Sequence, residues 1–126
     1  MPLLVPISVG ELLDKISILE IKAEAITDPA KHANVMRELA ALDAVRGREV
    51  ASSPELEALY AELQAVNRAL WRIEDDIRQL ECAGLFDSRF IELSRGVYRN
   101  NDRRAVLKRR INELTGSEIV EEKSYV

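Results

Sequence analysis

Residues 54–83 read PELEALYAELQAVNRALWRIEDDIRQLECA, and their apolar residues recur at alternating intervals of three and four. The repeat consists of Leu56, Leu59, Leu63, Val66, Leu70, Ile73, Ile77 and Leu80. This spacing, kept over more than three heptads, is typical of a helix packed along another helix in a left-handed coiled coil. Ser53 and Pro54 form a helix start signal, and Gly84 follows the last repeat. We therefore predict one long helix over 54–83.

A second long helix is predicted over 87–115, with Asp87 as its cap and Gly116 beyond its end. Its stripe consists of Phe90, Leu93, Val97, Asn100, Arg104, Leu107, Ile111 and Leu114. The connection between the two long helices is short, so they should form an antiparallel hairpin.

Two shorter helices are predicted before them. Ser8 and Glu11 match a capping box for a helix over 9–27, which is apolar on two faces and so should be central. Asp28-Pro29 starts a helix over 29–46. We expect one all-α domain, 1–126, in which two antiparallel hairpins form an elongated four-helix bundle.

The chain ends are predicted to be extended segments. The short hairpin should cover the open end of the long one, which brings both termini together. Residues 2–7 are then expected beside the tail at 119–125, which is expected to include a short strand.

Composition excludes several classes of protein. The 126 residues carry a net charge of −4, with one cysteine, Cys82, and one histidine, His32. An internal disulfide and a Cys/His zinc site are therefore ruled out, and we expect no metal and no cofactor. No signal peptide or apolar run of about 20 residues is present, so we expect a cytoplasmic protein without a membrane partner.

Residues 95–110 form a basic window with seven basic side chains and one acid. The stripe of Arg95, Arg99, Arg103 and Arg110 points outward and is best interpreted as a solvated face paired with local acids; binding of an anionic partner is the alternative. We expect no nucleic-acid partner, because the window lacks interleaved aromatic residues for base stacking. Glu74, in an acidic run, is expected to pair with Arg95.

Asn100 and Arg104 interrupt the apolar stripe of the last helix. A charged residue on a core face must be paired, hydrated or functional. We predict that Arg104 pairs with Glu20 and that Asn100 and Asn67 lie nearby. The alternative is a small-anion site, binding or catalytic, between the helices at Arg104, Lys108 and Asn100.

The closed end of the long hairpin should be left uncovered. Its apolar residues are Trp71, Ile73, Ile77, Leu80, Phe86 and Phe90. A monomer seldom exposes this much contiguous apolar surface. We therefore predict a homodimer or another protein partner at this end, and a non-enzymatic interaction or assembly module as the function.

Three stretches resemble a known family. They are VGELLDKISILEIK at 9–22, YRNNDRR at 98–104 and EEKSY at 121–125. The chain resembles, over nearly its whole length, small bacterial proteins known only as a domain of unknown function. The resemblance implies no established activity and assigns no functional residue.

Overall fold

The computed structural model describes residues 1–124, and these residues form four helices and no strand. The helices are α1 (Val9–Ala25), α2 (Pro29–Glu49), α3 (Pro54–Ala83) and α4 (Ser88–Thr115). The predicted all-α class and the four helices are confirmed. Helix α1 ends two residues earlier than predicted and α2 three residues later, while α3 has the predicted bounds.

Side-chain and glycine caps set the helix ends. Ser8 Oγ accepts from the Glu11 amide at 3.0 Å, and Ser53 Oγ accepts from the Leu56 amide at 3.1 Å. Asp28 and Asp87 cap α2 and α4 in the same way. Gly84 and Gly116 follow α3 and α4 with φ of 67° and 64°, a left-handed conformation that favours glycine.

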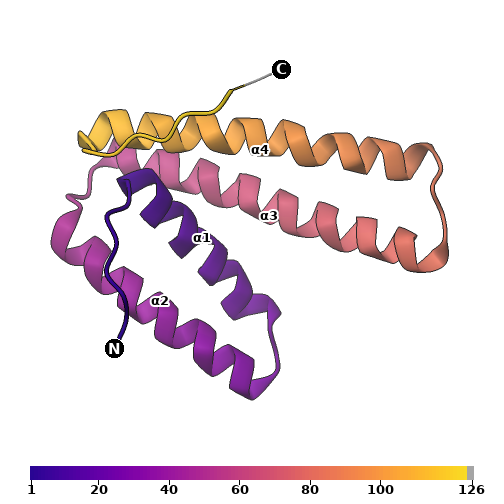
Figure 1. The fold of residues 1–126 in the computed structure, drawn as a ribbon, viewed down its shortest axis with the longest axis horizontal. Helices are drawn as coiled ribbons and strands as arrows, with labels where there is room; N and C mark the ends of the chain where they lie inside the picture. The colour runs from indigo at the N-terminus through magenta and orange to yellow at the C-terminus, as the bar shows by residue number, and fades with distance from the viewer. Residues whose placement is uncertain (125–126) are drawn as a thin grey trace.

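The helices pair as two antiparallel hairpins (Figure 1). Helices α3 and α4 lie side by side along their length, and the α1–α2 hairpin packs on the half that lies near the α2–α3 connector. The α1–α2 hairpin is inclined, so the two hairpins diverge toward the α3–α4 turn. The short hairpin therefore covers the open end of the long one, as predicted.

Helix α1 occupies the centre of the covered half, because it packs against each of the other three helices. The core is built from α1, α3 and α4 and consists of Leu12, Leu13, Ile16, Leu56, Leu63, Val66, Leu70, Leu107 and Ile111. Leu39, Leu42 and Val45 of α2 are partly buried against it. The predicted central position of the first helix follows from this packing.

The covered and uncovered halves differ sharply in burial. Beyond Leu70, α3 has no buried residue, and α4 has none before Leu107. The heptad repeat thus continues into a region where its apolar residues are only partly shielded.

The chain ends meet at one point rather than along a strand pair. Ser8 Oγ donates to the Glu121 carboxylate, and the Val9 amide donates to Ser117 Oγ at 3.1 Å. Residues 2–7 lead away from the tail, which runs back along α4 (Figure 1). The expected pairing of 2–7 with the tail and the expected strand are therefore wrong for residues 1–124, and position 125 lies outside the described residues.

Candidate functional site

A buried carboxylate joins three helices. Asp14 of α1 is 1% exposed. Arg104 of α4 binds it with two nitrogens: Nε donates to Oδ1 at 2.8 Å, and Nη2 donates to Oδ2. Asn67 of α3 donates from Nδ2 to Asp14 Oδ1 and to Ser17 Oγ, both at 3.0 Å. The charge of Asp14 is therefore both paired and hydrogen-bonded, as a buried charge must be.

The predicted partner of Arg104 was wrong. Glu20 instead accepts a hydrogen bond from Gln64 Nε2 at 2.6 Å, and Asp14 takes its place. The reason is the enclosure of α1 by three helices, which buries Asp14 and Ser17 although they lie off the main apolar stripe. The sequence placed the acid on the correct helix but about a turn and a half too far along it.

Hydrogen bonding outweighs burial in setting the charge state of Asp14. Burial raises the pKa of a carboxyl group, but hydrogen bonds from Arg104 and Asn67, with the charges of Arg104 and Lys108, hold the pKa of Asp14 below its usual value. The hydrogen bond to Asp14 correspondingly raises the pKa of Arg104. Both groups are charged at neutral pH.

A second set of polar contacts binds α1 and the tail to the end of α4. The Gly10 amide donates to Asn112 Oδ1 at 2.7 Å, and Asn112 Nδ2 donates to Glu121 at 3.1 Å. Asn112 is 1% exposed. Sequence reasoning missed it because the tail, whose path no periodicity predicts, supplies part of its cover.

Gly10 permits a close approach of α1 to α4. A Cβ at this position would lie 2.6 Å from the Lys108 carbonyl oxygen and 2.9 Å from Asn112 Oδ1. The first contact is with backbone and cannot be relieved by a side-chain rotation. Glycine is therefore required here by packing.

The residues of the predicted anion site are arranged as follows. Lys108 Nζ lies 2.5 Å from a Glu11 carboxylate oxygen, and Asn100 donates to the Gly96 carbonyl of its own helix at 2.8 Å. Arg104 and Lys108 also line an open depression of about 300 Å³, together with Asn101, Ala105 and Lys123. Lys123 in turn contacts Asp102 at 2.8 Å.

Two of the four outward arginines of the basic window have acids within reach. Arg99 pairs with Glu92 at 3.0 Å, and Arg103 pairs with Glu62 at 3.2 Å. These contacts agree with the interpretation of a solvated face. The predicted pair of Glu74 with Arg95 is not formed, and the cross-hairpin pair at this level is Arg89–Asp76 at 3.6 Å.

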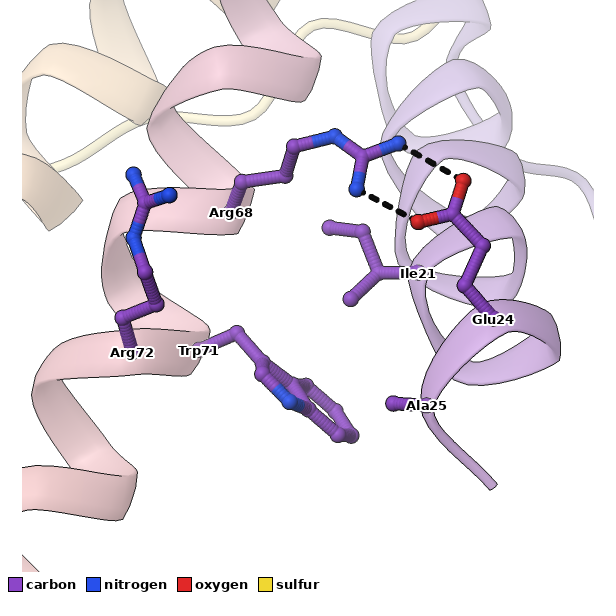
Figure 2. Close-up of a pocket in the computed structure, with 6 residues that line it drawn as sticks. All are labelled: Ile21, Glu24, Ala25, Arg68, Trp71 and Arg72. Atoms are coloured by element: carbon purple, nitrogen blue, oxygen red, sulfur yellow. Dashed lines mark hydrogen bonds and ion pairs between the residues drawn. The ribbon is translucent and has the colours of Figure 1, made fainter. Parts of the chain in front are cut away.

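A notch opens where the hairpins diverge, and Trp71 stands in it (Figure 2). The indole extends from α3 toward Ala25 at the end of α1, below the ion pair of Arg68 with Glu24, whose two contacts are 2.7 and 2.9 Å. Open depressions of about 330 and 270 Å³ border Trp71. The first is lined by Ile21, Glu24, Ala25, Arg68 and Arg72, and the second by Ile18, Asn67, Leu70, Glu74, Asn101 and Arg104.

Past the notch, the apolar residues of the long hairpin are only partly shielded from solvent. Among the predicted interface residues, Phe86 is 57% exposed, and Trp71, Ile73, Ile77, Leu80 and Phe90 are partly buried. Phe86 and Phe90 form an edge-to-face pair with ring centroids 5.2 Å apart. Leu85, Ile91 and Tyr98 are also exposed in this half of the hairpin, at 50%, 55% and 56%, and were missed because they lie off the heptad stripe.

The fold defines an all-helical protein with a polar centre at α1 and α4 and an uncovered hairpin end. Within residues 1–124, no helix is long and apolar enough to cross a membrane, and no group of three or more His, Cys, Asp or Glu side chains is placed to hold a metal ion.

The chain belongs to a family of unknown function, DUF6165, whose model matches residues 3–126. No curated protein and no solved structure matches it. The three stretches that carried the resemblance are linked in the structure through the contacts Asp14–Arg104 and Asp102–Lys123.

Proposed function

We propose that this chain is a non-enzymatic assembly module that pairs with a second copy of itself. The docking surface is the distal hairpin, defined as residues 71–83 of α3 and 88–101 of α4. The setting expected from the sequence, the cytoplasm of a bacterium, is part of this proposal. The observation that carries it is the continuation of the apolar repeat beyond the point where α1 stops covering it.

Two helices alone shield an apolar seam poorly, whereas four helices enclose it. In the covered half, α1 closes the core against α3 and α4, and α2 packs on α1 and adds partly buried residues from outside. In the distal hairpin, no other segment of residues 1–124 covers the apolar seam in this way. Two distal hairpins, one from each copy, would together supply the four helices that such a bundle needs.

Replacing Ile91 with glutamate is expected to prevent self-association. Ile91 is 55% exposed, so the change should leave the fold of each copy intact while placing a charge in the interface. Val106→Glu is the matched control, because Val106 is 46% exposed on the same helix but outside the distal hairpin. Sedimentation equilibrium should give a dimer for the native chain and Val106→Glu, and a monomer for Ile91→Glu.

A native chain that sediments as a 14.2 kDa monomer at tens of micromolar would overturn the proposal. Dimers that dissociate equally in both variants would place the contact elsewhere.

A small-anion site is the second candidate, supported by the open depression that Arg104 and Lys108 share with Asn101. Titration with phosphate, followed by NMR shifts of the Asn101 side-chain amide, tests it. Saturable shifts that are lost in Lys108→Gln would support the site, and the absence of shifts at millimolar phosphate would exclude a phosphate site.

A further inference from the structure

The position of α1 limits how a second copy can approach. Asn67 on α3 and Arg104 on α4 both face α1, which lies across that side of the long hairpin. Because a helix repeats every 3.6 residues, the same side continues along the distal hairpin through Trp71, Glu74 and Arg78 of α3. On α4 it continues through Val97 and Phe90, one and two heptads before Arg104.

On this side, α1 already fills the covered half. A second hairpin running parallel to the first would collide with it, so the two distal hairpins must run antiparallel. In that arrangement the turn of each copy reaches the end of the partner's α1. The notch at Trp71 lies at this place (Figures 1 and 2).

We propose that each copy inserts its hairpin tip, Leu85 and Phe86, into the partner's notch beside Trp71. This inference rests on the proposed self-association. It adds the relative direction of the two hairpins and the contact at the centre of the interface. The tip is apolar and exposed, at 50% for Leu85 and 57% for Phe86. The notch offers an aromatic wall and two adjoining open depressions, which an inserted side chain would cover.

Charge supports the same pairing. Arg68 in the notch is already paired with Glu24, but Arg72 forms no ion pair with any residue in 1–124. One acid lies on each side of the tip: Glu81 precedes it and Asp87 follows it. An inserted tip brings negative charge toward Arg72 in the first depression, whereas Glu74 in the second depression carries the same sign.

Fluorescence of Trp71, the only tryptophan in the chain, tests the inference on the full-length protein. Dilution through the dissociation range should shift its emission to longer wavelength, because the partner's tip leaves the indole. Phe86→Ser should weaken dimerisation about thirtyfold or more, the size expected for an interface hot spot. Leu114→Ser, 46% exposed at the other end of α4, is the matched control and should dimerise like the native chain.

A disulfide tests the antiparallel register. If residue 86 meets the partner's residue 71, Cys82 lies opposite residue 75. Positions 75 and 82 of one helix are about 10 Å apart, too far for a bond within one chain. Oxidised Asp75→Cys should therefore form an interchain 75–82 disulfide, identified by peptide mass spectrometry, while the native chain with Cys82 alone should not cross-link.

The failures of the two proposals are distinguishable. A monomeric native chain would remove both. Suppose that Ile91→Glu dissociates the dimer, but Phe86→Ser dimerises normally and dilution leaves the Trp71 emission unchanged. The self-association would then stand, and the tip-in-notch contact would be overturned. Efficient Cys82–Cys82 cross-linking of the native chain would overturn the antiparallel direction.

Discussion

Replacing Arg104 with methionine is expected to lower the free energy of unfolding by about 3 kcal/mol, the lower end of the range for breaking a buried ion pair from one side. The group left without a partner is Asp14, which is 1% exposed and would keep only its hydrogen bond from Asn67. A loss at the lower end of this range is expected because the Arg104 side chain is 29% exposed and borders solvent. Urea unfolding at pH 7 measures the loss.

The double variant Asp14→Leu, Arg104→Met is the control that separates pairing from packing. It removes both charges, and apolar replacements of whole buried pairs are often neutral. We expect it to recover most of the loss, with a coupling energy of about 2 kcal/mol between the two positions. An Arg104→Met chain as stable as the native one would exclude a structural role for this arginine and favour the anion site.

The loss of stability caused by Arg104→Met should also depend on pH. In the native chain the lowered pKa of Asp14 gives a stabilisation that is fully present above the unfolded value of about 3.9 and is lost as the pH falls through the folded pKa. Without Arg104, burial should instead raise the pKa of Asp14 above the unfolded value, so protonation relieves the penalty. The stability difference between native and variant is therefore expected to shrink between pH 7 and about pH 4.

Gly10→Ala is expected to cost about 2–3 kcal/mol, the upper part of the range for overpacking. Its Cβ would meet the Lys108 carbonyl oxygen at 2.6 Å, so α1 must move away from α4 and its hydrogen bond to Asn112 must lengthen. Thermal unfolding followed by circular dichroism measures the effect.

Gly47→Ala provides the opposite control. Gly47 lies inside α2, and a Cβ there would meet nothing within 4 Å. Alanine should stabilise this helix by about 0.5–1 kcal/mol. Equal destabilisation by both changes would mean that the close approach at Gly10 is not the cause.

Local signals predicted the helices well where they were strong. Ser53-Pro54 and Gly84 fixed both ends of α3, whereas α2 passes through Gly47 to Glu49 because a lone glycine does not stop a helix. The polar centre was harder to predict. The apolar stripe assigns one buried face to each helix, but α1 is enclosed on three sides, so the stripe did not place Asp14 in the core. The second apolar face at Ile18 and Ile21 was the available signal for that enclosure.

The contact between Asp14 and Arg104 spans 90 positions of the chain, and this separation has a consequence in time. During synthesis at about 5–20 residues per second, α1 emerges roughly 5–18 seconds before the arginine that neutralises its buried acid. Helices α1 and α2, like α3 and α4, meet across a short connector and can pair as soon as both exist, but the side of α1 that packs on α3 and α4 must wait for them. We therefore expect α1 to dock on the long hairpin late, and that apolar side of α1 to need protection in the nascent chain.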